Sequence, residues 1–321
     1  MKAIGALLGA LALAFAAPLT AQSWPAKTVT IVSGYSAGSG FDVFARFLAE
    51  NLRDRTGQPF LVENRPGAFG NLAAQYVARA APDGYTALLT ANSTHAANIH
   101  LYKKLGFDPI RDFTPVTTIL SQGFVLLVNP AVVPVNSVAE LTAYIKARPG
   151  KLDYGASAIT ARIATELYLS LAGGLDVTYV PYKAATQAFN DLLGGEIHFM
   201  FTGAGSGMPQ ARAGKLRALA VTNAQRTSAA PEIPTMAEAG LPGYEVRSWF
   251  ALFFPAGTPI RIAQKLAELS NASWATEKGR EFLRNLASDP FPGDPDSLAK
   301  LVESEIPKWG RIIKGAGIEP Q

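Results

Sequence analysis

The sequence contains no cysteine in its 321 residues and has three histidines. The lack of cysteine excludes disulfides, thiolate nucleophiles, cysteine-ligated metals and lipid attachment at a cysteine, so an apolar core must supply the stability. The histidines, His95, His100 and His198, are too dispersed to form a metal site of useful spacing. The glycine-rich segments of the chain carry no complete dinucleotide fingerprint. We therefore expect that the protein binds neither a metal nor a cofactor.

Charged residues are few as well, at 17% of the chain, and the formal net charge is +4. The basic residues are scattered and form no run of five or six, which argues against a nucleic-acid interface. The small positive excess weakly favours anionic small molecules. A chain of this length that is 48% hydrophobic has enough material for two lobes.

The one long apolar run lies at the N-terminus, where Lys2 is followed by residues 4–17 and then by small residues up to Ala21. At about 14 residues this run is shorter than the roughly 20 that span a bilayer as a helix. The pattern predicts a secretory signal over residues 1–21, cleaved after Ala21, and a mature protein in the periplasm. An uncleaved membrane anchor is the alternative interpretation.

Short β-branched runs alternate with helix-length amphipathic stretches along the rest of the chain. The first run, 29–32, is followed by a glycine-rich turn and by Phe41, Phe44 and Leu48, whose spacing is that of a helix that covers a sheet. Such alternation predicts parallel βαβ units in a doubly wound α/β fold. In these folds, ligands bind beyond the carboxyl ends of the strands.

The pattern restarts at the apolar run 124–128, which we interpret as the beginning of a second lobe. The chain after about Glu245 has too few elements for a third domain, so we expect it to pack on the first lobe. The predicted organisation is therefore a first lobe of residues 22–122 plus 245–321 and a second lobe of residues 123–244. Two crossings, near Gln122 and Glu245, would form a hinge that allows the lobes to close on a ligand.

The most distinctive local motif is the turn of residues 34–42, between the first predicted strand and its helix. Its glycines allow a tight turn and a close approach to a ligand, and the free N–H groups at a helix start attract anions. Ser39 and Asp42 have the spacing of a capping box. We predict that the turn contacts a ligand and that Asp42 caps the helix.

The same turn also matches the nucleophile elbow of serine hydrolases, because Gly34, Ser36 and Gly38 have the G-x-S-x-G spacing. A serine nucleophile needs a histidine base that is oriented by an acid. His95 follows a polar turn and is the credible base, but no acid is marked to orient it. A serine hydrolase using Ser36 is therefore the remote alternative, and we expect that the protein is not an enzyme.

A second polar turn, residues 155–162, lies between a strand and a helix of the second predicted lobe. Arg162 is the arginine nearest to either turn and could bind a carboxylate in bidentate fashion, although it could equally be a solvated helix residue. Residues 203–207 read as a flexible turn after a strand and do not define a phosphate site. The two turns from opposite lobes predict a clamp on a small anion.

Several motifs together carry a family resemblance that extends over the whole predicted mature chain. They include Val62-Glu63-Asn64-Arg65-Pro66-Gly67-Ala68, Pro82-Asp83-Gly84-Tyr85-Thr86, Val180-Pro181-Tyr182-Lys183 and Pro255-Ala256-Gly257-Thr258-Pro259. With these motifs the chain resembles the periplasmic solute-binding proteins of tripartite tricarboxylate transporters, the Bug or TctC family. The resemblance implies a type II periplasmic-binding-protein fold, with a ligand cleft between two doubly wound α/β lobes.

In this family the ligand is held largely by backbone N–H groups, small hydroxyls and water at the turns after the strands. Carried over to this sequence, the resemblance implies first-lobe contacts from Tyr35, Ser36, Ala37, Gly38, Ser39, Gly40, Ser93 and Thr94. In the second lobe it implies contacts from Ser157, Ala158 and Thr160, with Tyr182 and Lys183 nearby and Thr202 and Gly203 after a later strand.

This sequence departs from the family pattern at Phe69, Arg162, Ala184, Gln187 and Thr202, and three of these positions bear on the ligand. Phe69 stands where a glycine is usual, Arg162 replaces a histidine at the start of the second-lobe helix, and Thr202 replaces an aspartate. The missing aspartate removes a partner for an amino group, whereas Phe69 and Arg162 together suit a flat acid. We therefore count all three among the ligand contacts and hypothesise a non-amino carboxylate, either aromatic or dicarboxylic.

The resemblance further implies a monomeric receptor that delivers its ligand to the membrane components of a tripartite tricarboxylate transporter. A sensor that presents its closed form to a receptor kinase would use the same ligand trap. The sequence does not separate transport from sensing, so the sensor function stays an open alternative.

Overall fold

The computed structural model describes residues 24–182, 184–227, 230–315 and 317–320. The predicted signal, residues 1–21, and Lys183 lie outside these ranges. The strands are β1 (Val29–Ser33), β2 (Phe60–Asn64), β3 (Thr86–Ala91), β4 (Phe113–Val128), β5 (Asp153–Ala156), β6 (Thr178–Pro181), β7 (Phe199–Gly203), β8 (Arg217–Val221), β9 (Arg247–Pro255) and β10 (Asp289–Pro290).

Helices and single helical turns connect most of these strands. They are α2 (Gly40–Thr56), η1 (Ala68–Gly70), α3 (Asn71–Ala78), η2 (Ser93–Ala97), α4 (Asn98–Leu101), α5 (Val138–Lys146), α6 (Ile159–Leu171), α7 (Ala185–Gly194), α8 (Ala204–Arg212), α9 (Ile260–Trp274), α10 (Glu277–Asn285) and α11 (Pro295–Gly315). Two segments differ from the sequence-based expectation. The expected flexible turn 203–207 begins α8, and the expected polar turn after β3 is helical, as η2.

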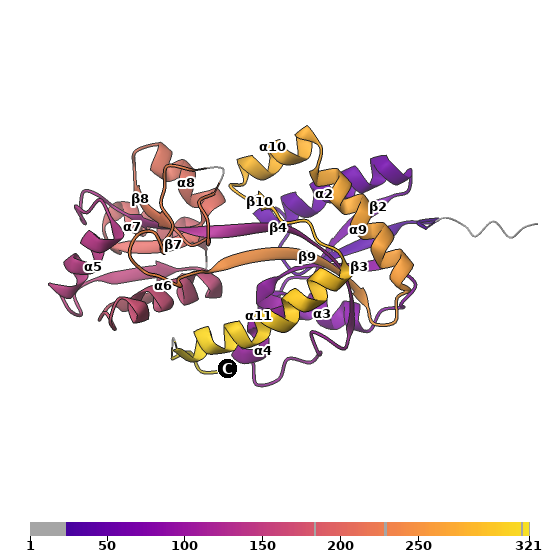
Figure 1. The fold of residues 1–321 in the computed structure, drawn as a ribbon, viewed down its shortest axis with the longest axis horizontal. Helices are drawn as coiled ribbons and strands as arrows, with labels where there is room; N and C mark the ends of the chain where they lie inside the picture. The colour runs from indigo at the N-terminus through magenta and orange to yellow at the C-terminus, as the bar shows by residue number, and fades with distance from the viewer. Residues whose placement is uncertain (1–23, 183, 228–229, 316, 321) are drawn as a thin grey trace, which may run out of the picture.

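Two lobes lie side by side and are joined by the long strands β4 and β9 (Figure 1). In the first lobe the strand order is β2-β1-β3-β9-β4, with β1 parallel to both β2 and β3. In the second lobe β5 is parallel to β6 and to β7. The predicted α/β class is confirmed, but β9 and β4 run antiparallel to their neighbours, so the sheet is mixed.

Strand β4 changes partners at one point in its course. Up to Gly123, which is opposite Arg247, it pairs with β9 of the first lobe. From Phe124, which is opposite Gly203, it pairs with β7 and also with β8 of the second lobe. One continuous strand therefore belongs to both sheets.

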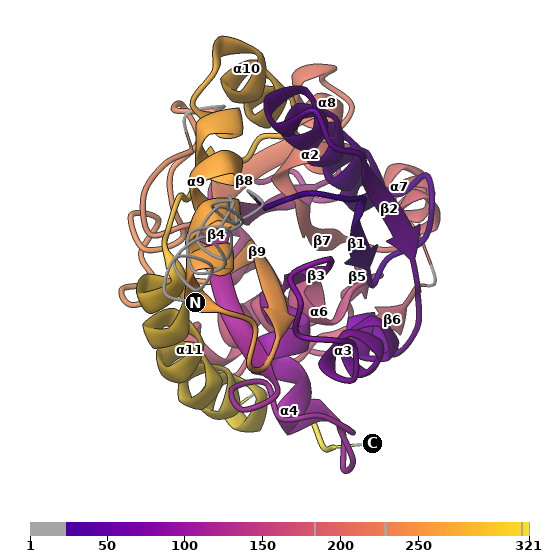
Figure 2. The same cartoon turned by 90° about the vertical axis from the view of Figure 1, so that its right-hand side faces the viewer.

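Helices cover both faces of each sheet, which places the apolar core in layers. Figures 1 and 2 show α2, α9 and α10 on one face of the first-lobe sheet and α3, α4 and α11 on the other. The buried residues of α2 and α9, such as Phe44, Leu48 and Leu266, form one core cluster with β1 and β9. In the second lobe, α7 and α8 pack on one face and α5 and α6 on the other.

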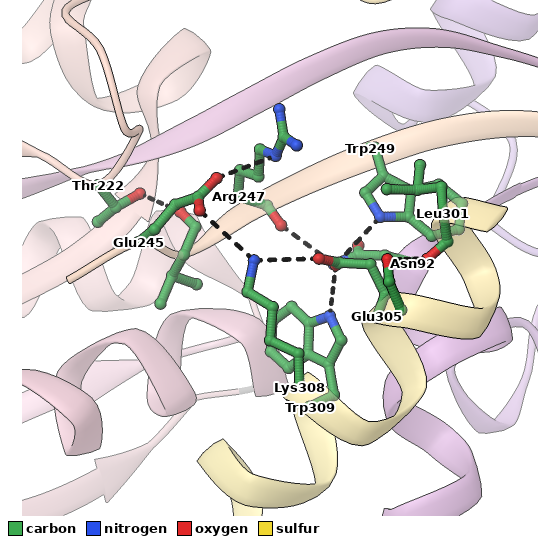
Figure 3. Close-up of polar contacts among 11 residues, drawn as sticks. Asn92, Thr222, Glu245, Arg247, Trp249, Leu301, Glu305, Lys308 and Trp309 are labelled. Carbon is green, nitrogen blue, oxygen red and sulfur yellow. Dashed lines mark hydrogen bonds and ion pairs between the residues drawn. The ribbon is translucent and has the colours of Figure 1, made fainter. Parts of the chain in front are cut away.

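A buried carboxylate joins helix α11 to the connecting strand β9 (Figure 3). Glu305 is 4% exposed and accepts hydrogen bonds from the indole Nε1 of Trp249 at 3.2 Å and of Trp309 at 2.9 Å. Lys308 lies 3.0 Å from Glu305 and 3.6 Å from Glu245, just before β9. Because Trp249 binds Glu305 and Glu245 lies beside Lys308, α11 is anchored to the start of β9.

Hydrogen bonds also tie the same crossing to both lobes. On the second-lobe side, the Thr222 hydroxyl donates to the carbonyl of Val246 at 2.5 Å and accepts the N–H of Phe124 at 2.7 Å. On the first-lobe side, the Asn92 amide donates to the carbonyl of Arg247 at 3.1 Å. These bonds connect the two crossing strands to each other and to Asn92, the residue before η2.

Within the described ranges, no helix has both the length and the hydropathy that a bilayer crossing requires.

Candidate functional site

The β1–α2 turn is organised around Asp42, although the helix cap itself is Ser39 and not Asp42 as predicted. Ser39 is the N-cap of α2 and accepts the N–H of Asp42 at 3.3 Å. The Asp42 carboxylate accepts from Arg46 Nε and from the N–H of Gly38, both at 2.9 Å, and from the Asn64 amide at 2.9 Å. The hydrogen bond from Arg46, aided by those from Gly38 and Asn64, holds the pKa of this carboxyl below its usual range.

The outer part of this turn is free to meet a ligand. Ser36, Ala37 and Gly38 are exposed, and Gly38 has the left-handed φ of +76°. The backbone N–H groups of Ser36 and Ala37 donate to no other residue that the structure describes. Since Gly38 N–H is taken by Asp42, Ser36 and Ala37 keep the free backbone donors among these three exposed residues.

Behind this turn lies a polar centre that Tyr35 and Ser93 share. The Tyr35 hydroxyl is 3.2 Å from Ser93 Oγ, and its ring stacks on Phe41 with 4.1 Å between ring centroids. Burial raises the pKa of the Tyr35 phenol above its ordinary value, so this group is a neutral hydrogen-bonding partner at physiological pH. Ser93 is itself buried, in η2.

Phe69 lies in a turn whose backbone is strained. Four consecutive residues, Gly67 to Gly70, have positive φ values, and those of Ala68 and Phe69 are +46° and +51°. A left-handed conformation costs a residue with a Cβ about 1–2 kcal/mol. The Phe69 carbonyl accepts from Thr94 Oγ1 at 3.0 Å and from Asn98 Nδ2 at 3.2 Å, which holds the turn. Strain of this kind is typical of ligand-binding sites, and here it leaves the Phe69 side chain 44% exposed.

Close backbone packing fixes this strained turn against the rest of the first lobe. A Cβ added at Gly34 would lie 2.6 Å from the Cα of Gly70, and one at Gly70 would lie 2.6 Å from Thr94 Oγ1. The β1–α2 turn, the 67–70 turn and η2 are therefore in direct contact. Thr94 is fully buried, so in this structure it supports the Phe69 turn, and its predicted contact with a ligand stays a prediction.

In the second lobe, Arg162 lies in the first turn of α6. The preceding Ala158 is the N-cap and supplies no side-chain cap, Ser157 is half-buried and Thr160 is buried. Arg162 Nε lies 3.8 Å from the Glu166 carboxylate, and the guanidinium lies 4.6 Å from the centre of the Tyr179 ring. Its buried Nε has no hydrogen-bond partner among the described residues, so donor capacity remains.

Phe69 and Arg162 meet across the gap between the lobes. They line one cavity of about 120 Å³, together with Leu101 and Tyr102 of the first lobe and Ile159 of the second. Ile318 and Glu319, beyond α11, complete the lining. The sequence suggested that Phe69 and Arg162 act together, and the structure brings them to the same cavity from opposite lobes.

Two further predicted contact residues are engaged in internal hydrogen bonds. The Tyr182 hydroxyl donates to Asp191 at 2.6 Å, and burial together with this bond raises the pKa of Tyr182 to about 12. Thr202 is buried, and its hydroxyl lies 3.4 Å from Ser206 at the start of α8. Both hydroxyls are therefore engaged within the second lobe, and their predicted contact with a ligand stays a prediction.

The hydrolase interpretation required His95 to approach Ser36, and that expectation is wrong. Ser36 is exposed, whereas His95 is fully buried and stacks on Phe253 with 3.9 Å between ring centroids. Neither ring nitrogen of His95 has a hydrogen-bond partner in the described ranges. Burial lowers its pKa to about 3, so His95 is a neutral core residue. The helical η2 carries its ring into the core instead of toward the turn.

No cluster of three or more His, Cys, Asp or Glu residues that could hold a metal occurs in the described part of the chain.

Comparison with known proteins identifies a family and relatives of known structure. Residues 44–318 match the family described as the tripartite tricarboxylate transporter family receptor. The protein BugT of Bordetella pertussis is 32% identical over 305 residues, which cover 94% of this chain and 93% of BugT. Among solved structures, R. palustris Rpa4515 with adipate is 39% identical with a TM-score of 0.83, over 93% of this chain and 100% of that one. The periplasmic binding protein BugD is 31% identical with a TM-score of 0.79, over the same shares.

Proposed function

Because the chain belongs to the tripartite tricarboxylate transporter receptor family, we propose that it captures a non-amino organic carboxylate in the periplasm and delivers it to that transporter's membrane components. The observation that carries this proposal is the pairing of Phe69 and Arg162, from opposite lobes, in one cavity. The complex of Rpa4515 with adipate supports a carboxylate as the ligand class. We also propose that the signal at residues 1–21 directs export and is cleaved after Ala21, and that the receptor acts as a monomer.

In this proposal the acid binds between the free N–H groups of the first-lobe turn and the guanidinium of Arg162. The exposed Ser36 and Ala37 supply backbone donors, and Arg162 supplies the positive charge. A charge-assisted hydrogen bond from arginine to a carboxylate is stronger than a neutral one. Phe69 offers an aromatic face beside the acid, which suits a flat ligand.

We also propose that the lobes move about the crossings near Gln122 and Glu245, with residues 22–122 plus 245–321 as one body and residues 123–244 as the other. The change of partners along β4 between Gly123 and Phe124 supports this division. So do the hydrogen bonds of Thr222, which bind the second lobe to both crossing strands. Hinge closure of this kind is how two-lobed receptors enclose small ligands.

Calorimetry with a panel of mono-, di- and tricarboxylates tests the proposal. At least one acid should bind, and Arg162→Gln should weaken that acid by about 10- to 100-fold, since a hydrogen bond to a charged group contributes about 1.5–3 kcal/mol. Arg261→Gln, at an exposed position of α9, is the matched control and should bind like the unmodified protein. If the receptor binds only amino acids, or if Arg162→Gln binds the acid equally well, the proposal is wrong.

The transporter partnership needs its own experiment. Uptake of the acid identified by calorimetry should be lost in cells that lack either this receptor or the membrane components. Uptake that persists without the membrane components, combined with a transcriptional response that needs the receptor, would instead favour the sensor function.

A further inference from the structure

A second and larger cavity, of about 360 Å³, lies between the lobes on the side of α2 and α10. Its first-lobe wall is almost entirely apolar and is made by Phe41, Phe44, Leu120, Phe250 and Leu286. Across from this wall, Gly203, Gly205 and Ser206 contribute the start of α8 in the second lobe. This volume is within the range of small-molecule sites, about 300–1,000 Å³.

The aromatic wall is continuous with the candidate site and is held rigidly. Tyr35 stacks on Phe41, whose ring centroid lies 4.4 Å from that of Phe250. Phe44 in turn stacks on Trp274 of α9 with 4.8 Å between centroids. A ligand bound at the β1–α2 turn can therefore extend along these rings into the cavity.

Contacts between the lobes close the far end of the cavity. The Gln122 amide donates to the carbonyl of Leu286 at 2.9 Å, and a Cβ added at Gly205 would lie 2.4 Å from that carbonyl oxygen. The next residue, Ala287, has a left-handed φ of +45° and packs in the core cluster of the second lobe. The turn after α10 therefore abuts α8, and the cavity ends there.

No charged side chain lines this cavity among the residues that the structure describes. Its polar side chains are those of Gln122, Ser206 and Ser288. A second carboxylate placed here would be desolvated without a cation to pair with, which costs several kcal/mol. An uncharged apolar group would be favoured at the same place by contact with the aromatic wall.

We infer that the receptor selects monocarboxylates that carry an apolar ring, with the ring in the 360 Å³ cavity and the acid group at the Ser36 turn. This inference rests on the proposed function and decides between the aromatic and the dicarboxylic class. A dry apolar cavity of roughly 150 Å³ is enough to hold a benzene ring. The cavity therefore accommodates a six-membered ring and part of the chain that joins it to the carboxylate.

Calorimetry with three acids of similar chain length tests the inference: 3-phenylpropanoate, 3-cyclohexylpropanoate and adipate. Both ring acids should bind at least tenfold more tightly than adipate. Tighter binding of adipate than of both ring acids would overturn the inference while leaving the carboxylate receptor intact. If no acid of this panel or of the wider panel binds, the inference and the proposed function both fail.

Placing a positive charge in the cavity provides an independent test. Gln122→Lys supplies the missing cation beside Leu286, and its ammonium can still donate to the Leu286 carbonyl. The ratio of ring-acid affinity to adipate affinity should fall at least tenfold in this variant. Gln225→Lys, at an exposed position after β8, adds the same charge and should leave the ratio unchanged. An unchanged ratio in a folded Gln122→Lys protein would show that the cavity does not hold the ligand's tail.

Discussion

Replacement of His95 by leucine is predicted to stabilise the protein and to make its stability less sensitive to acid. The ring is fully buried against Phe253 and Phe113, and neither nitrogen has a hydrogen-bond partner in the described structure. A buried polar group without a partner costs about 1–3 kcal/mol. Leucine has a similar volume and no polar atom, so His95→Leu should gain about that amount at pH 7.5.

The acid dependence follows from the lowered pKa of His95, which is about 3 in the folded protein and about 6.5 in the unfolded chain. Below pH 6.5 the unfolded chain binds a proton that the folded protein does not, so the free energy of unfolding falls as the pH falls. Each pH unit is worth about 1.4 kcal/mol. Between pH 7.5 and pH 5 the His95 contribution therefore amounts to a loss of about 2 kcal/mol, which His95→Leu abolishes.

Urea denaturation followed by tryptophan fluorescence measures both effects, because the chain has four tryptophans. Between pH 7.5 and pH 5 the free energy of unfolding should fall by about 2 kcal/mol less in His95→Leu than in the unmodified protein. The denaturant slopes of the two proteins should be equal. Equal losses in the two proteins would refute the buried, neutral state of His95. A lower stability of the variant at pH 7.5 would instead indicate that its ring nitrogens are hydrogen-bonded.

Three further predictions concern the support of the site, each read out by urea unfolding. Asp42→Asn should lower the free energy of unfolding above pH 4, where the Asp42 carboxylate is ionised in both the folded and the unfolded chain. In the unmodified protein this contribution is lost as the pH falls through the lowered pKa of Asp42, so the stability of the variant should depend less on acid. Glu305→Leu should cost about 2–6 kcal/mol, because it leaves two buried indole N–H groups without their acceptor, whereas Lys308 keeps its ion pair with Glu245. Gly34→Ala should cost about 1–3 kcal/mol and weaken acid binding, because its Cβ meets the 67–70 turn, whereas Gly194→Ala has open space.

Local sequence patterns were sufficient to predict the α/β class and the first helix start. The spacing of Ser39 and Asp42 correctly placed the N-cap of α2, because a capping box is set by residues three apart in the chain. The apolar run 124–128 likewise marked the entry of β4 into the second lobe. What the pattern missed is that this run is the end of one strand that begins at Phe113. Two shifts of register and a proline interrupt the alternation of β4, so the hydrophobic pattern alone divides it into separate segments.

The candidate site depended on features that a sequence does not display. The sequence does not predict the left-handed φ of Ala68 and Phe69, because residues other than glycine rarely adopt it. The hydrogen bonds that hold this turn, from Thr94 and Asn98 to the Phe69 carbonyl, come from residues distant in the sequence. His95 was misplaced because three polar residues after a strand suggest a surface turn, whereas here the segment is a buried helix. The larger cavity combines residues from α2, β4, β7, α8, β9 and the turn after α10, and no local motif predicts that combination.

The two strained non-glycine turns border two different cavities between the lobes, and their contacts suggest different tasks. The backbone of Phe69 is held by hydrogen bonds from the first lobe, so its exposed ring is positioned before a ligand or Arg162 approaches. Ala287, by contrast, belongs to the first lobe in sequence but packs in the core of the second. If the lobes move about the crossings near Gln122 and Glu245 as proposed, the packing of Ala287 and the hydrogen bond from Gln122 to Leu286 join the lobes at the Gln122 crossing. A ring acid bound as inferred would then have its apolar end in the cavity beside this joint, where Leu286 forms part of the wall.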